Sequence, residues 1–477
     1  MTITPIIGLE VHVELKTKSK MFCGCDADHF HVDPNTHTCP VCLALPGALP
    51  VPNQAAVDMC LKLGLALGCT VQSTSFFERK NYFYPDLPKG YQISQYQKPF
   101  TINGSITISG HKIRINRAHL EEDTAKSVHL NGETLIDYNR SGVPLVEVVS
   151  EPDIPSPEVA KEYLLKIQQI IRYLGISDAD IEKGSMRCEP TVNLKIDDNK
   201  QTFYTPLAEI KNIASLTGVQ TAIQYEIDRQ AKQFAEDHVV KSSSSSKGSS
   251  VGGKTTRGWD ADKSVTFLQR EKEGSSDYRY FPEPDIPPFE FTEDYIENIR
   301  ATLPELPDAK IAKYKSLSLS DYDAKLLADD SVFSSIFEKV LNGSTDPEFV
   351  KFVTNLLIGP LKTIDLDIQK INPGFFKNIF DHKSELSSSA IKQIILASYQ
   401  TGTDPLVLAK EQNLFQVSDT GAIKEFAKKI LADNPKAVED YKKNPNSIGF
   451  LIGQLMKASA GSANPQIAKE IMIKLLE

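Results

Sequence analysis

The sequence predicts an α+β protein in which a region of mixed strands and helices is followed by a helical region. Between Ile6 and Pro288, alternating and helical hydrophobic patterns occur in irregular order, which argues against a regularly alternating doubly wound sheet. The proline-rich segment 282–288 then interrupts regular structure, and only helical spacing follows it. A chain of 477 residues has room for roughly two to four domains.

The first predicted strand alternates strictly between apolar and ionisable side chains from Gly8 to Leu15. Because successive side chains of a strand point to opposite faces, Glu10, His12 and Glu14 share one face and the other face is apolar. The apolar face predicts a buried core. The ionisable face suits either solvent or a functional site.

Four cysteines follow this strand in a Cys-X-Cys and a Cys-X-X-Cys pattern: Cys23, Cys25, Cys39 and Cys42. Four thiolates at this spacing can hold one tetrahedral zinc ion, and a site without an open position is structural. The segment 23–42 therefore predicts a zinc clip, with unligated buried cysteines as the alternative. Three histidines in the same segment could replace a thiolate, although we expect them to be exposed: His29, His31 and His37.

Two further stretches place acidic side chains in or beside apolar strands. One runs from His119 to Asp123 with three consecutive acids, and the other is Leu145 to Glu151, where Glu147 stands among apolar residues. We expect Glu151 on the same face as Glu147. Carboxylates and an imidazole that converge from separate strands suit Mg²⁺ beside a nucleotide. Salt-bridged surface acids explain the same spacing equally well.

Cations that could meet phosphate groups lie close in sequence to these acids: Arg79, Lys80, Lys89, Arg117, Lys126, Arg140, Arg187 and Lys211. A mixture of acids and cations is typical of a phosphoryl-transfer site, where metal and cationic side chains stabilise the moving phosphoryl group. Each cation taken singly is more often part of a surface salt bridge.

One apparent nucleotide motif is rejected. The stretch from Gly248 to Thr255 fits the spacing of a P-loop, but it follows the serine-rich tract 242–250 instead of a buried strand. We interpret it as a chance match in an exposed loop, so that any nucleotide site uses other residues.

The region after the proline-rich segment has helical spacing at 311–341, 347–371 and 422–476. The residues from Gly402 to Pro405 predict that one helix ends and another begins. We therefore expect three domains, at 1–292, 293–400 and 401–477.

The net charge of −9 argues against a protein whose whole surface binds nucleic acid, because phosphate contacts need clustered Lys and Arg. Local basic patches remain compatible with this charge. No stretch approaches the ~20 consecutive apolar residues of a membrane helix, and the N-terminus lacks the pattern of a secretory signal. We therefore expect a cytoplasmic protein without a membrane partner.

A resemblance to one known family rests on eleven strings in order along the chain: IGLEVHVEL from Ile7, MFCGC from Met21, CPVCLALPGALPV from Cys39, ERKNYFYPDLPKGYQISQY from Glu78, HLEEDTAKS from His119, DYNRSGVPLVEVVSEPD from Asp137, GSMRCE from Gly184, EIKN from Glu209, TRGWD from Thr256, DYRYFPEPDIPP from Asp277 and GFLIGQLMKASAGSANP from Gly449. With these strings the chain resembles, nearly end to end, the B subunits of the amidotransferases that act on Asp-tRNA(Asn) and Glu-tRNA(Gln).

The resemblance implies a glutamine-synthetase-like cradle domain with a mixed or antiparallel sheet, then a helical domain and a small all-α tail that contacts tRNA. It implies an ATP-dependent carbon-nitrogen ligase that phosphorylates the side-chain carboxylate of the misacylated tRNA. The acyl phosphate then receives ammonia, which an amidase (glutaminase) subunit makes from glutamine and a channel delivers. A small third subunit is implied as well, so that the whole enzyme is a heterotrimer.

The resemblance also implies roles for individual residues. Metal ligands for Mg²⁺ are Glu10, His12, Glu122 and Glu147, and Glu151 joins this catalytic group. Contacts to ATP come from Lys89, Arg140 and Arg187, and the four cysteines hold structural Zn²⁺.

The tail departs from the basic composition expected of a tRNA-binding surface. Residues 401–477 hold ten Lys against nine Asp plus Glu, although Lys436, Lys442, Lys443 and Lys457 could form one face. The archaeal glutamine-specific relative would carry an inserted domain, for which no insertion of sufficient length is present. A non-catalytic tRNA-binding adaptor of the same fold is the other alternative.

Overall fold

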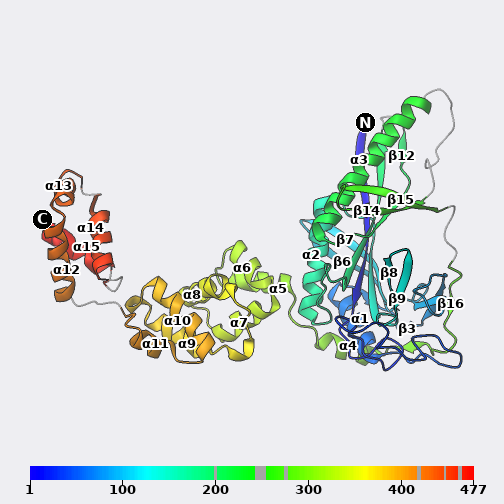
Figure 1. Cartoon of the computed structure of the whole chain (residues 1–477), viewed down its shortest axis with the longest axis horizontal. Coiled ribbons are helices and arrows are strands. Elements are labelled where there is room, and N and C mark those ends of the chain that lie inside the picture. Colours follow the sequence, from blue (N-terminus) through cyan, green and yellow to red (C-terminus); the bar gives the residue numbers. More distant parts are fainter. Residues whose placement is uncertain are drawn as a thin grey trace. The chain divides into compact units, whose positions relative to one another are not determined.

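The computed structural model divides into two compact units, Met1–Leu306 and Pro307–Glu477 (Figure 1). It describes residues 1–197, 201–241, 254–272, 278–415, 420–444, 447–459, 463 and 465–476. The serine-rich tract 242–250 and most of the P-loop-like stretch lie outside the described residues, so the interpretations of both stay predictions.

Within the described residues, the largest sheet of the first unit has ten strands in the order β15-β14-β13-β11-β1-β10-β7-β6-β2, with β12 paired to β11. All its pairs are antiparallel except β13 with β14. The strands are β1 Thr2–Glu14, β2 Thr70–Val71, β6 Thr101–Ile108, β7 His111–Glu122, β10 Pro144–Ser150, β11 Met186–Asp197, β12 Thr202–Tyr204, β13 Ala208–Lys211, β14 Lys254–Asp260 and β15 Val265–Lys272.

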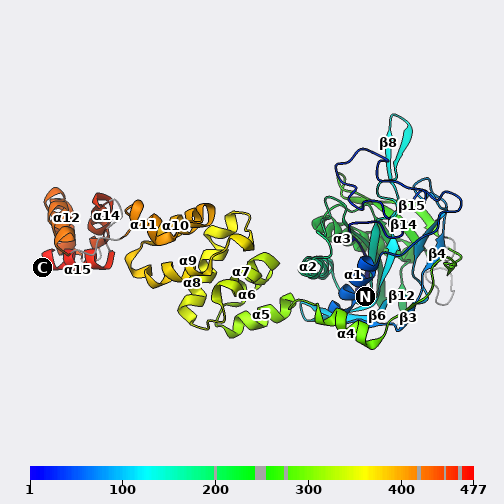
Figure 2. The ribbon, with the colours of Figure 1, turned by 90° about the horizontal axis from the view of Figure 1, so that it is seen from below.

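Smaller sheets surround one end of this large sheet. They are formed by β16 Phe281–Pro282, β4 Glu78–Asn81 and β5 Tyr91–Ser94, by β17 Phe289–Glu290 and β3 Thr74–Ser75, and by β8 Lys126–Leu130 and β9 Glu133–Asp137. The β8–β9 hairpin projects from the unit (Figure 2). Its two-residue turn, Asn131-Gly132, has positive φ at both residues, as tight hairpin turns require.

The core of the first unit lies between one face of the large sheet and three helices: α1 Gln54–Ala66, α2 Pro157–Leu174 and α3 Leu216–Lys241. Helix α2 begins where the Ser156 side chain accepts the Val159 N–H, and it ends at Gly175 in the left-handed region. A fourth helix, α4 Glu293–Ala301, packs into the same core through Ile296 and Ile299.

The second unit is helical in the residues described and contains two separate hydrophobic cores. The first core involves the helices α5 Pro307–Ser316, α6 Asp321–Ala328, α7 Ser331–Leu341, α8 Pro347–Ile358, α9 Pro373–Asp381, α10 Ser388–Thr401 and α11 Pro405–Glu411 and short 3₁₀ turns at Pro360–Thr363, Ile368–Lys370 and Lys383–Glu385. The second involves α12 Thr420–Asp433, α13 Pro435–Lys443, α14 Ile448–Ala458 and α15 Pro465–Leu476.

The predicted helix end and restart near residue 402 is confirmed. Helix α10 ends at Gly402, which has a φ of 72°, and the Asp404 side chain accepts the Leu406 N–H at the start of α11. The α+β class is also confirmed, because the mixed sheet lies in the first part of the chain and the named elements after it are all helices. Among the described residues, no helix is both long enough and apolar enough to cross a membrane.

Candidate functional site

A row of ionisable side chains crosses four neighbouring strands of the large sheet. In the strand register, His119 on β7 lies opposite Glu147 on β10, which lies opposite His12 on β1, which lies opposite Arg187 on β11. In the next row, Glu10 lies opposite Glu189. Residues that are directly opposite share a face, so the register brings these groups together.

The opposite face of the same strands is part of the hydrophobic core, where Val11, Val13, Val146 and Val148 are fully buried. The alternation read from Gly8 to Leu15 thus fixes the ionisable face outward from the core. Glu14 lies on that face and is buried as well.

The centre of the site is a group of His12, Glu121 and Glu147, whose ligand atoms lie within 4.8 Å of one another. Nε2 of His12 is 3.5 Å from Glu147 and 3.7 Å from Glu121, and Nε2 of His119 is 3.2 Å from Glu147. The buried Nδ1 of His12 makes no hydrogen bond. Carboxylate oxygens around one imidazole form a donor set that fits a hard divalent cation.

Charges inside this group are strongly coupled. Burial alone would lower the pKa of His12, but the carboxylates of Glu147 and Glu121 outweigh burial and raise it to about 9. Burial likewise opposes ionisation of Glu147, yet His119 and His12 hold its pKa well below the usual range. Burial and the charge of Glu147 raise the pKa of Glu10. The acids are therefore close enough to repel one another, and an additional positive charge near them would reduce this repulsion.

These groups line a cleft of about 920 Å³ in the first unit. Its cationic lining residues are Lys80, Arg117, Arg187, Lys211 and Lys254, and its acidic ones are Glu10, Glu121, Asp123, Glu147, Glu189 and Glu209. Burial would lower the pKa of Lys80, but Glu121 and other neighbours raise it, so this lysine is positively charged at neutral pH. The cleft therefore combines carboxylate oxygens, which suit a divalent cation, with cationic side chains, which suit a phosphate group.

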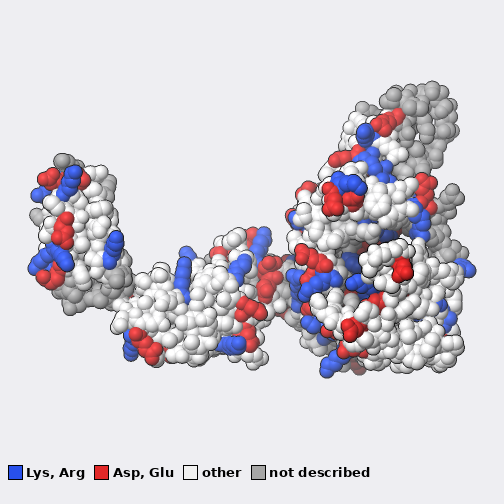
Figure 3. All heavy atoms as spheres, in the orientation of Figure 1, with Lys and Arg blue, Asp and Glu red and all other residues white. Residues whose placement is uncertain are grey.

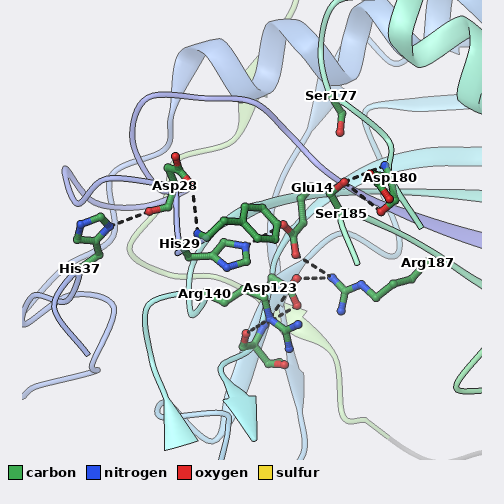
Figure 4. Close-up of polar contacts among 12 residues, drawn as sticks. Glu14, Asp28, His29, His37, Asp123, Arg140, Ser177, Asp180, Ser185 and Arg187 are labelled. Atoms are coloured by element: carbon green, nitrogen blue, oxygen red, sulfur yellow. Dashed lines mark hydrogen bonds and ion pairs between the residues drawn. The ribbon is translucent and has the colours of Figure 1, made fainter. Parts of the chain in front are cut away.

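Arg187 holds one end of the cleft together by bridging two acids. Its guanidinium donates to Asp123 and lies 3.8 Å from Glu14, and Figure 4 shows it pointing toward both. Burial would raise the pKa of Asp123, but Arg187 and Arg140 lower it far below its usual range. The other oxygen of Glu14 accepts from His29 at 2.9 Å.

The side chain of Glu122 lies on the opposite face of the sheet from the group of His12, Glu121 and Glu147 and is not part of that group. Its Oε2 accepts from Lys89 at 2.5 Å and its Oε1 accepts from the Ile93 N–H at 2.9 Å. Both charged residues line a separate cavity of about 230 Å³, beside Cys42. Since side chains of β7 alternate, His119 and Glu121 share a face and Glu122 takes the other one.

Two other expected residues also lie outside the central group. Glu151 follows the end of β10 at Ser150 and accepts from Asn116 at 2.8 Å, and Asn116 is the residue of β7 that the register irregularity leaves without an opposite residue on β10. Arg140 donates to backbone oxygens of Thr124 and Ala125 and reaches Asp123 at 3.6 Å.

The residues that sequence reasoning missed or left unassigned are Glu121, His119 and Lys211. A signal for Glu121 was present, because a period of two starting at His119 selects Glu121 and not Glu122. Lys211 was noted only as one of eight cations. Its place beside Glu189 follows from strand order, which the sequence alone does not give.

The four clip cysteines converge as their spacing predicts. The sulfur atoms of Cys23, Cys25, Cys39 and Cys42 lie within 4.8 Å of one another, a donor set that fits a closed zinc site. The Cys39 N–H donates to the Cys42 sulfur at 3.1 Å, and Nζ of the fully buried Lys20 lies 3.8 Å from it. A hydrogen bond from Cys23 and these neighbours lower the pKa of Cys42 to about 5.

The three histidines of the clip segment are not part of this sulfur cluster. His29 contacts Glu14, the His37 ring bonds the backbone oxygen of Asp28, and His31 has a φ of 58°.

In the tail, Lys436, Lys442 and Lys457 are exposed, but α13 also carries acids, and Figure 3 shows both charges on α12–α15.

The sequence matches two families. The GatB/GatE catalytic domain family matches residues 5–297, and the GatB domain family matches residues 335–476. Several proteins named as B subunits of aspartyl/glutamyl-tRNA(Asn/Gln) amidotransferase are similar over their whole length. The one from Persephonella marina is 43% identical over 100% of both chains, and the one from Thermotoga maritima is 41% identical over 100% of both. The one from Thermomicrobium roseum is 42% identical over 100% of this chain and 99% of its own.

The full-length matches confirm the resemblance seen in the eleven strings. They cover both the sheet unit with the cleft and most of the helical unit. The chain therefore belongs to the family of the B subunits of aspartyl/glutamyl-tRNA(Asn/Gln) amidotransferases.

Proposed function

We propose that this chain uses ATP to phosphorylate the side-chain carboxylate of Glu-tRNA(Gln), of Asp-tRNA(Asn), or of both, and that ammonia then converts the acyl phosphate to the amide. The observation that carries the proposal is the group of His12, Glu121 and Glu147, set in a cleft lined by five cations. The names of the full-length relatives support the same two tRNA substrates.

The chemistry explains why such a cleft is needed. A carboxylate oxygen of the aminoacyl group attacks the γ-phosphorus of ATP, the bond from that phosphorus to the bridging oxygen breaks, and ADP leaves. Ammonia then attacks the acyl carbon, inorganic phosphate leaves, and a proton is released. Acids and phosphates all carry negative charge, so cationic side chains are required to bring them together.

We propose that Glu10, His12, Glu121 and Glu147 hold Mg²⁺, with Glu121 replacing the Glu122 expected from the sequence. When bound, this ion neutralises phosphate charge and orients the terminal phosphoryl group. Lys80 and Arg117 border the same group and are placed to contact phosphate or carboxylate oxygens.

Arg187, which sequence reasoning assigned to phosphate, lines the cleft and remains in that role. It also fixes Asp123 and Glu14 in place. We propose no direct phosphate contact for Lys89 or Arg140, since Lys89 pairs with Glu122 in the smaller cavity and Arg140 bonds the backbone.

We propose that the four cysteines bind structural Zn²⁺ and so fix the segment that follows β1. The clip would stabilise the β1 end of the cleft, because Asn53 at the start of α1 donates to the backbone oxygens of Ser19 and Lys20. We also propose the three-domain division near residues 292 and 400. The separate cores of the second unit support a division of that unit, and since α11 packs into the first core, that core extends beyond residue 400.

We propose that an amidase (glutaminase) partner and a small third partner complete a heterotrimer with this chain. The sequence lacks the Ser-Lys amidase signature needed to make ammonia from glutamine. Because the substrates are aminoacyl-tRNAs, we place the complex in the cytoplasm. A non-catalytic adaptor is not favoured, since full-length relatives are named as parts of amidotransferases, and an adaptor needs no buried acid group.

The test uses the full chain purified with the candidate amidase and the candidate small partner, and measures ATP hydrolysis and amide formation with each misacylated tRNA. We expect hydrolysis that depends on at least one of the two tRNAs. Glu147→Gln should abolish hydrolysis while tRNA binding persists, and Glu151→Gln is the matched control because it lies outside the group. No stimulation by either tRNA would overturn the proposal, and so would full activity of Glu147→Gln.

A further inference from the structure

The row of side chains that contains Glu10 and Glu189 continues across three more strands to the edge of the sheet. On β13, Nζ of Lys211 lies 2.6 Å from Glu189. Lys211 is opposite Gly258 on β14, and Gly258 is opposite Phe267 on β15. The row therefore ends in an aromatic side chain.

The side chain of Phe267 lies on the cleft face of the sheet. This follows because Thr266, next to Phe267, and Trp259, next to Gly258, both contact helix α3 on the other face. The Trp259 ring contacts Tyr225 of α3 at 6.4 Å, and Thr266 donates to Glu226 of α3 at 3.0 Å. Neighbours in a strand point to opposite faces. Gly258 and Phe267 thus share the face of Lys211, whose neighbour Ile210 is in the core.

The Phe267 ring lies directly over Gly258. A Cβ atom at Gly258 would be 2.4 Å from Cζ of Phe267, so a glycine is required for this ring position, although its backbone is not in the left-handed region. The ring nevertheless remains exposed, at 46% of the residue. An aromatic ring that rests against a glycine and remains half exposed is suited to stack on another planar group.

One lysine of the row, Lys211 on β13, lies between this ring and the acidic group. Lys254 begins β14, four residues before Gly258; like Lys211 it contacts Glu209, at 3.3 Å against 3.1 Å, and lines the cleft. The order along the row is therefore ring, lysine, carboxylates. A nucleoside triphosphate has the same order of parts: a flat base, then phosphates, then a terminal phosphoryl group bound to a metal ion.

We propose that Phe267 is the stacking platform for the base of the phosphoryl donor, with Lys211 contacting its phosphates. This inference rests on the function proposed above. Neighbouring strands are about 4.8 Å apart, so β14, over which the ring lies, is roughly 14 Å from β1. That span is on the order of the length of an extended nucleoside triphosphate.

The terminal base of an aminoacyl-tRNA fits this position less well. Its aminoacyl group is attached to the terminal ribose, so no phosphate lies between the base and the reacting carboxylate. Here Lys211 stands between the ring and the acids. A different aromatic pair, Tyr96 stacked on Tyr280 at 4.7 Å, lines the cleft near Arg117 and is available to other groups.

The test compares variants in the heterotrimer by two measurements: the Kd of ATP, by titration calorimetry without tRNA, and the KM values for ATP and aminoacyl-tRNA. Phe267→Ala should raise the Kd and KM of ATP by about 5- to 100-fold, as expected when one stacked base loses its aromatic partner. Phe267→Trp should preserve both. Gly258→Ala should weaken ATP binding as well, because the new methyl group displaces the ring. Leu268→Ala, an equally exposed neighbour, is the matched control.

Inorganic tripolyphosphate serves as a probe without a base. Its inhibition constant should be the same in wild type and Phe267→Ala, but higher in Lys211→Ala. An unchanged ATP Kd in a folded Phe267→Ala complex would overturn the inference. A rise confined to the KM of aminoacyl-tRNA would overturn it too, since the platform would then serve the tRNA. Either result with an active wild-type complex leaves the proposed function intact, whereas an inactive wild type removes that function first.

Discussion

Replacing Glu121 by Gln is the most direct test of the metal site, because its neighbour Glu122 supplies an internal control of the same chemistry. Gln keeps the shape of Glu121 and can still accept from Ser94, whose Oγ is 3.1 Å away. It removes one carboxylate from a group whose ligand atoms lie within 4.8 Å. Even residues behind the ligands of metal sites change affinity by about 10- to 100-fold, so we expect at least that rise in the Mg²⁺ concentration for half-maximal activity.

Glu122→Gln should have the opposite effects: it should lower the thermal stability and leave the Mg²⁺ requirement unchanged. Its side chain and that of Lys89 are 3% and 11% exposed, and the substitution leaves the lysine without its charge partner. Breaking a buried ion pair costs about 3 kcal/mol or more, which lowers Tm by about 5–10 °C in a unit of this size. The Mg²⁺ requirement should not change.

The assay is a Mg²⁺ titration of tRNA-dependent ATP hydrolysis, paired with direct Mn²⁺ binding by electron paramagnetic resonance and with thermal melting. If Glu122→Gln raises the metal requirement and Glu121→Gln does not, the assignment by strand alternation is refuted. If both variants melt normally and bind Mn²⁺ like the wild type, the whole cluster is not the metal site.

Three further predictions concern other parts of the chain. Elemental analysis should find zinc in the wild-type protein and in Cys69→Ala but not in Cys39→Ser, which should also melt at lower temperature. Gly104→Ala should lower the free energy of unfolding by about 1–3 kcal/mol in denaturant titrations, because the new Cβ would lie 2.7 Å from a backbone oxygen. The control Gly8→Ala, whose new Cβ has its nearest contact at 3.7 Å, should lower it much less. Equal losses of stability in the two variants would contradict this reasoning. Burial opposes ionisation of Glu338, but the two lysines within 3.0 Å of it lower the pKa of its carboxyl group overall. The ionised carboxylate therefore stabilises the fold at pH values above the ordinary pKa of glutamate. This stabilisation is lost as the pH falls through the lowered pKa of the folded state. The difference in Tm between wild type and Glu338→Gln should therefore shrink from pH 7 toward about pH 3, and a constant difference would exclude the effect.

The sequence predicts those parts of the site that depend on local periodicity. Alternation along β1 correctly placed Glu10 and His12 on one face, and cysteine spacing correctly brought four sulfur atoms together. The same rule, applied from His119, would have selected Glu121. Choosing Glu122 instead ignored the pleat of β7.

Other parts of the site depend on strand order, which no local pattern encodes. That β13 and β14 run parallel beside β11, and so bring Lys211 toward Glu189, follows only from the assembled sheet. The contact of Glu151 with Asn116 likewise depends on a register irregularity in which Asn116 of β7 has no opposite residue on β10, and no local pattern signals it. Phe267 was not singled out for the same reason, since its position over Gly258 depends on the pairing of the edge strand β15 with its neighbour β14.

The pairing of β1 with β11, in which Thr2 stands opposite Asp197, has a consequence during synthesis of the protein. Glu10 and His12 leave the ribosome first, yet they remain without Glu147 and Arg187 until most of the first unit has been translated. Closing so long a loop makes formation of the cleft a late step. Chains that terminate before β10 therefore contain Glu10 and His12 without the opposite groups of the cleft.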